Sequence, residues 1–199
     1  MYKRVIKRLL DLVISLMALP FVLIITLIVG PAIYLEDRGS VFYKANRRGL
    51  NGKIFQMYKF RSMKMNAPDL RNKDNSTYNS SNDPRVTHIG KILRKTSIDE
   101  LPQVFNIIKG DMSIIGPRAP IPKEDVDWNE LSDLQKKRLS VRPGLTGYTA
   151  ALYRNSIPQE EKHYWDCYYV DHVSFAMDFK IFFLTLKTVF SHKNIYTNT

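Results

Sequence analysis

The chain has 199 residues, which is enough for one domain with a sizeable core and short for a two-lobed, Rossmann-type enzyme. Its formal net charge of +11 and its pI near 9.7 predict an anionic partner, either nucleic acid, acidic lipid or a phosphorylated substrate. The single cysteine, Cys167, excludes an internal disulfide and a cysteine-based zinc site.

The first predicted element is an apolar, uncharged segment from residue 12 to residue 35. About 20 such residues suffice to span a bilayer, and the segment is too long for the apolar part of a signal peptide. Pro20 removes one helical hydrogen bond and favours a kink. Basic residues flank both ends, and such flanks prefer the cytoplasmic side. The pattern predicts a helix that enters, breaks near Pro20 and returns, with a straight spanning helix as the alternative.

Residues 41 to 63 mix β-branched, aromatic and basic side chains around a turn at residues 49–52, which predicts a short β-hairpin. In an extended second strand, Lys59 and Arg61 project from one face, where two neighbouring cations suit a diphosphate. The alternative is a solvated edge strand, which lysine commonly guards. The polar residues that follow, 64–83, predict a mobile surface loop.

A turn at Asp83-Pro84-Arg85 precedes a predicted short helix. That helix would place Ile89, Ile92 and Leu93 inward and Lys91, Arg94 and Lys95 outward. The outward cations are either solvated or lie against anionic lipid headgroups.

The most informative block runs from residue 96 to residue 118, T-S-I-D-E-L-P-Q-V-F-N-I-I-K-G-D-M-S-I-I-G-P-R. Phosphate chemistry at a divalent metal requires a carboxylate pair and a fixed guanidinium, here Asp99, Glu100 and Arg118. A structural alternative is a capping box from Ser97 to Glu100, in which both acids complement the helix dipole. Pro102 disfavours a helix that starts at Ser97, because it falls beyond the first turn. The residues alone leave both interpretations open.

The C-terminal part adds weaker signals. Asp125-Val126-Asp127 resembles a metal motif of two-domain glycosyltransferases, but no nucleotide-binding unit precedes it, so we interpret it as surface charge. Residues 142–147 predict a rigid loop whose backbone N–H groups could face phosphate. Residues 175–190 are too charged to span a membrane and too apolar for an ordinary surface helix, which predicts an interfacial helix, with a core helix as the alternative. The four histidines lack metal-ligand spacing.

Further motifs flank the central block in a characteristic order. They are K-R-L-L-D (Lys7 to Asp11), R-R-G-L-N-G-K-I-F (Arg47 to Phe55), Y-K-F-R-S-M (Tyr58 to Met63), D-P-R-V-T-H-I-G-K-I-L-R (Asp83 to Arg94), R-P-G-L-T-G (Arg142 to Gly147) and S-F-A-M-D-F-K-I (Ser174 to Ile181). With them the chain resembles, over nearly its whole length, the bacterial sugar transferases, monotopic phosphoglycosyl transferases that start glycan assembly on a polyprenol phosphate.

Two positions depart from the pattern of that family. Many members carry Ser-Pro at the helix break, whereas this chain has Leu19-Pro20. Many also carry a Gln-Val-Asn-Gly-Arg-Asn run where this chain has residues 150–155, of which only Arg154 and Asn155 match. The sugar preference therefore does not carry over.

The resemblance implies an α+β, mostly helical fold with a re-entrant membrane helical hairpin over residues 1–37, broken at Pro20. Residues 38–199 would form a membrane-associated catalytic domain, in which a small β-hairpin, interfacial amphipathic helices and the mobile loop 64–83 surround a compact core. The implied location is the cytoplasmic face of the cytoplasmic (inner) membrane, with monotopic topology.

The implied activity is transfer of a sugar-1-phosphate from a nucleotide diphosphosugar, with UDP expected, to undecaprenyl phosphate. Asp99 would attack the sugar-linked phosphate, release UMP and form a phosphosugar-aspartate, which the polyprenol phosphate then displaces. Glu100 would be a metal or proton partner, and both acids would hold Mg²⁺. The implied phosphate-binding residues are Lys59, Arg61, Arg85, Arg118 and Arg154.

Two alternatives belong to other functional classes. One is a non-catalytic basic membrane scaffold, in which Asp99 and Glu100 only cap a helix. The other is a nucleic-acid-binding protein, which the lack of a recognised binding signature and the apolar segment disfavour. The partners we expect are the nucleotide sugar, undecaprenyl phosphate and anionic membrane lipid, without nucleic acid, and a homo-oligomer is compatible with the sequence.

Overall fold

We describe the fold from a computed structural model, within which residues 1–70, 78, 80, 82–122, 126–154 and 156–191 are described. In chain order the elements are a π-helical turn η1 (Tyr2–Ile6), α1 (Lys7–Asp37), β1 (Phe42–Arg48), a 3-10 turn η2 (Leu50–Gly52), β2 (Ile54–Phe60), α2 (His88–Thr96), a 3-10 turn η3 (Ile98–Glu100), α3 (Gln103–Lys109), β3 (Ser113–Ile115), α4 (Asp133–Arg138), β4 (Gly144–Thr146), α5 (Tyr148–Leu152), α6 (Gln159–Asp171) and α7 (Phe175–Ser191). Helices dominate, and the strands form one antiparallel and one parallel pair, which confirms the mostly helical α+β class.

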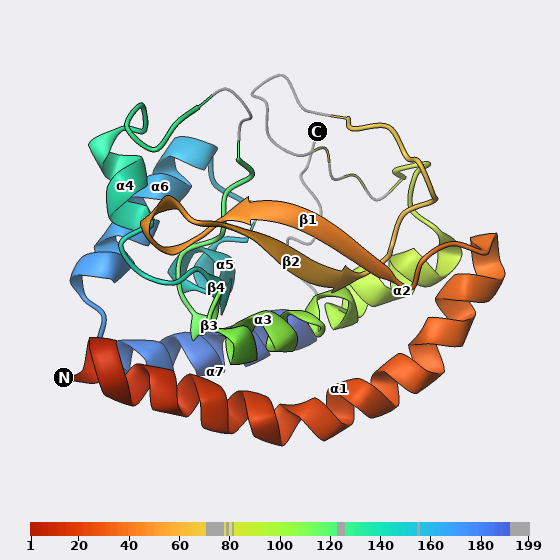
Figure 1. Ribbon diagram of the computed structural model, residues 1–199, viewed down its shortest axis with the longest axis horizontal. Coiled ribbons are helices and arrows are strands. Elements are labelled where there is room, and N and C mark those ends of the chain that lie inside the picture. Colours follow the sequence, from red (N-terminus) through yellow and green to blue (C-terminus); the bar gives the residue numbers. More distant parts are fainter. Residues whose placement is uncertain (71–77, 79, 81, 123–125, 155, 192–199) are drawn as a thin grey trace.

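Helix α1 curves along one side of the molecule, and the rest of the fold lies on its concave side (Figure 1). Pro20 and Pro31 both lie inside it. Proline lacks an N–H and clashes with the preceding turn, so it lets a helix bend without ending it. The sequence had led us to expect two helices separated by a break at Pro20. In the structure Pro20 lies instead within one continuous, curved helix. Among the described residues, η1 and α1 together form the one helix long and apolar enough to cross a membrane.

Polar contacts attach the N-terminal end of α1 to the body of the fold. The Tyr2 hydroxyl and the Lys7 ammonium each donate to Asp178 Oδ2 on α7 at 2.6 Å. One helical turn later, the buried carboxylate of Asp11 accepts the backbone N–H of Ile114 at 2.9 Å. These partly buried, charge-assisted contacts fix the start of the apolar helix against α7 and β3.

The C-terminal end of α1 is attached to the same body. Asp37 pairs with Arg61 at 2.5 Å, directly after β2. Glu36 accepts the backbone N–H groups of His88 and Ile89 at 2.6 and 3.1 Å, which caps the start of α2. Between the two attached ends, large apolar side chains of α1 are exposed. They are Leu16, Met17, Phe21, Leu23, Ile24, Leu27 and Ile28.

Strands β1 and β2 form the predicted hairpin, with Phe42 opposite Phe60 and Arg48 opposite Ile54. The tight turn between them contains Gly52 at φ +81°, a left-handed conformation that suits glycine. The side chain of Asn106 on α3 is fully buried and accepts the N–H of Tyr58 at 3.0 Å, so α3 is hydrogen-bonded to the edge of β2. This contact sets the distance between β2 and the residues that precede α3.

The parallel pair β3–β4 depends on glycine at its point of closest approach. A Cβ atom on Gly144 would lie 2.1 Å from the nitrogen of Gly116 and from the oxygen of Thr146. The N–H of Gly144 donates to Pro117 O at 3.0 Å, and that of Gly116 donates to Thr146 O at 2.9 Å. The two N–H groups join the two segments, so within the loop 142–147 the N–H of Gly144 is engaged by the protein and does not face a phosphate.

Helix α7 packs one face in the core, as the core-helix alternative predicts, and exposes aromatic side chains on its other faces. Ile181 is 1% exposed and packs in one cluster with Tyr169 of α6, so one face of α7 belongs to the core. On other faces Phe175, Phe179 and Phe183 are exposed. Helix α7 lies beside the first turns of α1 (Figure 1), and the ring of Phe175 meets that of Tyr2 edge-on.

Candidate functional site

Asp99 and Glu100 lie in the short turn η3, between α2 and α3, and not in the first turn of a long helix. Helix α2 ends at Thr96, and Ser97 follows in the left-handed conformation, with φ 59°. Ser97 makes no side-chain capping bond to η3, and Pro102 takes the N-cap position of α3. The predicted capping box is therefore not formed, and helix capping does not account for the two acids.

Lys59, at the end of β2, reaches Glu100 directly. Its ammonium lies 2.5 Å from Glu100 Oε1, and both side chains are largely but not fully buried, with 18% and 30% of their surface exposed. The pair joins residues 41 positions apart in the sequence. Because charge-assisted contacts are short and strong, this one fixes Glu100 relative to the hairpin.

The surroundings push the ionisation of the two acids in opposite directions. Burial, and to a smaller extent the charge of Glu100, raise the pKa of Asp99 to about 6, because the cations Lys59 and Arg94 offset these effects only in part. Burial also opposes ionisation of Glu100, but Lys59, Arg118 and Arg154 outweigh it, so the pKa of Glu100 lies below its usual value. A pair of carboxyl groups with separated pKa values is typical of acid, base and nucleophile assignments in active sites.

Arg118 and Arg154 come from two different loops, and the charges of both act on Glu100. Arg118 follows β3, is exposed, and stands between the buried residues Pro117 and Ala119. Arg154 follows α5 and has φ 48°, a left-handed backbone conformation that is uncommon for a side chain of its size. The structure therefore places Lys59, Arg118 and Arg154 where their charges act on Glu100, beside Asp99, and the catalytic and phosphate-binding roles of these residues stay predictions.

Arg61 and Arg85 are placed elsewhere, each with partners of its own. The guanidinium of Arg61 contacts Ser40 O, Asp37 and Ile33 O, and so ties β2 to the end of α1. Arg85 forms a two-pronged pair with Asp83 at 2.9 and 2.7 Å. Both arginines are 6% exposed. This arrangement gives each a structural role and does not support phosphate binding, because local carboxylates already hold their donors.

Arg85 also organises the ends of the predicted loop 64–83. Its Nη1 donates to Pro68 O at 2.8 Å and its Nη2 to Tyr78 O at 3.3 Å. Residues 71–77, 79 and 81 lie outside the described residues, as do Asp125 of the Asp125-Val126-Asp127 motif, Asn155 and His192. The mobility of the loop stays a prediction.

The described residues contain no group of three or more acidic, histidine or cysteine side chains that could hold a metal ion. Two adjacent carboxylates nevertheless fit Mg²⁺, which commonly takes one or two protein carboxylates and completes its shell with water and substrate phosphate. Asp99 and Glu100 are the hard oxygen donors that such a half-site needs, and Glu100 is held ionised by its cationic neighbours.

Sequence reasoning missed Arg94, which we had assigned to the outer face of α2. Its Nε donates to Ser62 Oγ at 2.9 Å, and its charge lowers the pKa of Asp99. Arg94 lies in the last turn of α2, three residues before Ser97, where the chain leaves the helix. The side chain of Arg94 is therefore close enough to Asp99 for its charge to act on it. The periodicity of α2 alone does not show this, because the turn that follows decides what its last residues meet.

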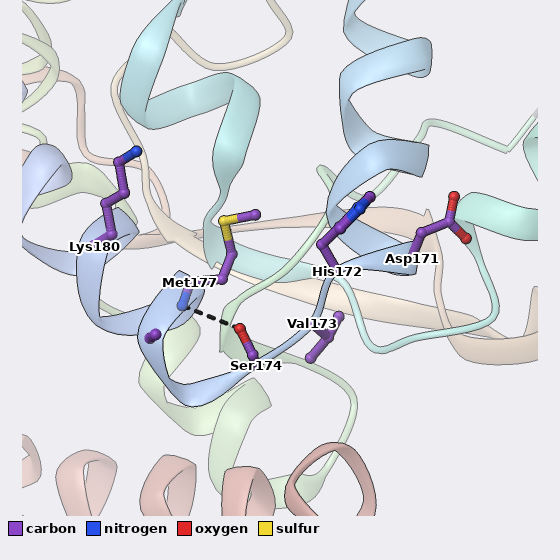
Figure 2. Close-up of a pocket in the computed structure, with 7 residues that line it drawn as sticks. Asp171, His172, Val173, Ser174, Met177 and Lys180 are labelled. Atoms are coloured by element: carbon purple, nitrogen blue, oxygen red, sulfur yellow. Dashed lines mark hydrogen bonds between the residues drawn. The ribbon is translucent and has the colours of Figure 1, made fainter.

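An open groove of about 560 Å³ lies at the junction of α6 and α7 (Figure 2). It is lined by Asp171, His172, Val173 and Ser174 at the junction and by Ala176, Met177 and Lys180 on α7. Its lining includes none of the carboxylates or cations of the site above. We therefore place the candidate chemistry at η3 and not in this groove.

Comparison with known proteins identifies the family of this chain. The sequence model of the bacterial sugar transferases matches residues 2–192. The chain is 41% identical over 192 residues to the galactosyl transferase CpsE of Streptococcus agalactiae, covering 92% of this chain and 42% of that protein. It is 37% identical over 210 residues to the undecaprenyl-phosphate galactose phosphotransferase of Salmonella typhimurium, covering 97% and 42%.

A third relative has a similar length. The uncharacterized sugar transferase EpsL of Bacillus subtilis is 37% identical over 192 residues, covering 96% of this chain and 90% of EpsL. The chain thus spans about two-fifths of the first two relatives and nine-tenths of EpsL. With a family match over almost its whole length and these three relatives, the chain belongs to the bacterial sugar transferase family.

Proposed function

We propose that this chain transfers a sugar-1-phosphate from a nucleotide diphosphosugar, UDP-linked, to undecaprenyl phosphate and releases UMP. The observation that carries the proposal is the carboxylate pair in η3, in which burial raises the pKa of Asp99, while three cations from separate segments lower the pKa of Glu100. Relatives named UDP-glucose:undecaprenyl-phosphate glucose-1-phosphate transferase, 34% identical to this chain, support the same donor and acceptor classes.

The proposed reaction has two displacements at one phosphorus atom. A carboxylate oxygen of Asp99 bonds to the sugar-linked phosphorus, and the bond from that phosphorus to the bridging oxygen breaks, so UMP leaves with the oxygen. An oxygen of the lipid phosphate then bonds to the phosphorus, and the bond to Asp99 breaks. The products are UMP and an undecaprenyl diphosphosugar, and the Asp99 carboxylate is restored.

The site suits the first displacement in two ways. A carboxylate whose pKa is about 6 is mostly ionised at pH 7, yet it is more basic than an ordinary aspartate and therefore a better nucleophile. The cations Lys59, Arg118 and Arg154 would bind the diphosphate and stabilise the charge that develops on the departing UMP. Mg²⁺ held by Asp99 and Glu100 would add charge neutralisation at the diphosphate.

The placement of α1 supports monotopic, re-entrant attachment to the cytoplasmic face of the inner membrane. Both ends of α1 are bound to the same folded body, through Asp178 and Asp11 at one end and Arg61 at the other. Ends tied to one body favour the same side of a bilayer, whereas the exposed apolar residues between them favour burial in lipid. The exposed phenylalanines of α7, beside the first turns of α1, would lie in the same interface.

The test is release of UMP from a panel of UDP-sugars by the purified protein with undecaprenyl phosphate and Mg²⁺. We expect turnover with at least one sugar and none in Asp99→Asn, because an amide cannot act as the nucleophile. A protein that is folded but turns over no UDP-sugar would contradict the proposal and favour the basic membrane scaffold instead.

A further inference from the structure

We infer that the buried ion pair Arg138–Asp166 positions the two arginines proposed to bind the diphosphate, Arg118 and Arg154. It would do so by holding the main chain of the two loops that carry them. Arg138 ends α4, and Asp166 lies in α6. Nε and Nη2 of Arg138 donate to Asp166 Oδ2 at 3.0 and 2.7 Å. The two residues are 5% and 2% exposed, so the pair is shielded from solvent on all sides.

One end of this pair reaches the loop of Arg118. Nη2 of Arg138 also donates to the backbone carbonyl of Arg118 at 3.3 Å. The flanking residues Pro117 and Ala119 are buried, whereas the Arg118 side chain is exposed. The pair therefore holds the main chain at this position and leaves the guanidinium available for a phosphate.

The other end reaches the loop of Arg154. The hydroxyl of Thr149 on α5 donates to the second carboxylate oxygen of Asp166. The carbonyl of the same threonine accepts the N–H groups of Tyr153 and Arg154 at 2.9 and 3.0 Å. Arg154 has φ 48°, and such a conformation persists only where the surrounding structure imposes it. Asp166 thus supports, through Thr149, the turn that directs Arg154.

One carboxylate therefore connects two loops that lie far apart in sequence and converge on Glu100. Arg138 and Asp166 have no contact with Asp99 or Glu100 among those of the described residues, so they would act by positioning and not by touching substrate. A purely structural pair would stabilise the fold without influencing how well the two arginines bind a diphosphate, and this difference can be measured.

The molecule contains a matched control for the pair. Lys137 and Asp171 join the same two helices, α4 and α6, at 2.7 Å, and their side chains are 44% and 50% exposed. Lys137 is next to Arg138 in the sequence, and Asp171 follows Asp166 on the same helix, so this second pair bridges the same elements, but its described contacts do not include the arginine loops. Its removal should therefore leave donor binding unchanged.

The test rests on the proposed function and uses the full-length protein in detergent or lipid nanodiscs. The central variants are Asp166→Asn and Thr149→Val, with Thr149→Ser and Asp171→Asn as controls. Losing one buried hydrogen bond should raise the KM for the UDP-sugar, and the dissociation constant for UMP, by about fivefold in Thr149→Val. The KM for undecaprenyl phosphate should stay within about twofold in every variant, and both controls should resemble wild type, since each keeps the contacts that position the arginines.

Double-mutant cycles decide between positioning and simple stabilisation. Arg154→Lys should cost clearly less in the Thr149→Val background than in wild type, because the arginine is already displaced there. Arg118→Lys should likewise cost less in Asp166→Asn; if that variant does not fold, the cycle with Thr149→Val and Arg154→Lys decides alone. Additive effects, or a lower melting temperature with unchanged donor KM and UMP binding, would overturn the inference. A wild-type protein that turns over no UDP-sugar would instead contradict the proposed function, and UMP binding would still test the positioning.

Discussion

The raised pKa of Asp99 predicts that neutralising this residue stabilises the protein while abolishing its activity. The pKa of the group is about 6 in the folded protein, against a usual value of 3.8, so the folded state binds the proton more tightly than the unfolded chain does. Ionisation of Asp99 therefore destabilises the fold. This destabilisation is absent below about pH 4, grows as the pH rises to about 6, and has reached its full size at pH 7. Asparagine carries no charge and avoids this loss.

The shift of about two pH units, from 3.8 to about 6, corresponds to roughly 3 kcal/mol at most. Because the carboxylate is only partly buried and solvent screens it, about 1 kcal/mol is a better expectation for Asp99→Asn at pH 7. For a chain of this size that raises the melting temperature by about 2–4 °C. Differential scanning fluorimetry in detergent at pH 7 and at pH 4.5 measures it, and the gain should shrink at the lower pH.

Glu100→Gln is the matched control, with the opposite sign. The pKa of Glu100 lies below its usual value, because Lys59, Arg118 and Arg154 outweigh burial, so its charge stabilises the fold at neutral pH. This variant should therefore melt at a lower temperature than wild type at pH 7. If Asp99→Asn instead melts lower at pH 7, as expected of an acid that complements a helix dipole, the reasoning about Asp99 is refuted.

Three further results are expected. Arg118→Lys keeps the charge but loses the planar fork, so kcat/KM for the UDP-sugar should fall by about tenfold or more, and normal kinetics would remove Arg118 from the site. The kcat/KM of wild type should fall as the pH drops below about 6, where Asp99 becomes protonated. Glu100→Gln should move this acidic fall to lower pH, because the charge of Glu100 raises the pKa of Asp99. If the fall stays at the same pH, it belongs to another group. Single cysteines placed at Lys3 and at Ser40, in a background without the native cysteine, test the topology of α1. Both should resist a membrane-impermeant thiol reagent in intact cells and react with it in opened cells. A spanning helix predicts opposite behaviour at the two positions.

The sequence predicted the elements whose determinants are local. The glycine-containing turn after Arg48 and the β-branched and aromatic residues around it indicated the hairpin, which the structure confirms. The central block placed Asp99 and Glu100 together simply because they are adjacent in the chain. That Lys59 and Arg118 join them was implied by the family motifs, because spacing alone cannot bring a strand and a loop to the same carboxylate.

The sequence could not show with which residue each buried charged side chain forms its ion pair. Arg85 pairs with an acid two residues away, and Arg61 with one 24 residues away, although both motifs also suit a phosphate. Arg138 and Asp166 are separated by 28 residues on two helices, and neither lies in a motif that we had singled out. Such pairings follow from how helices pack, which amphipathic periodicity does not encode.

The central claim, a covalent phosphosugar on Asp99, can be tested by intact-protein mass spectrometry after mixing the protein with its UDP-sugar and Mg²⁺ in the absence of lipid acceptor. We predict a mass increase equal to one sugar phosphate, release of about one UMP per protein molecule, peptide mapping of the adduct to Asp99, and loss of the adduct when undecaprenyl phosphate is added. Steady turnover with acceptor but no adduct and no UMP without it, or an adduct that maps to another residue, would contradict the account.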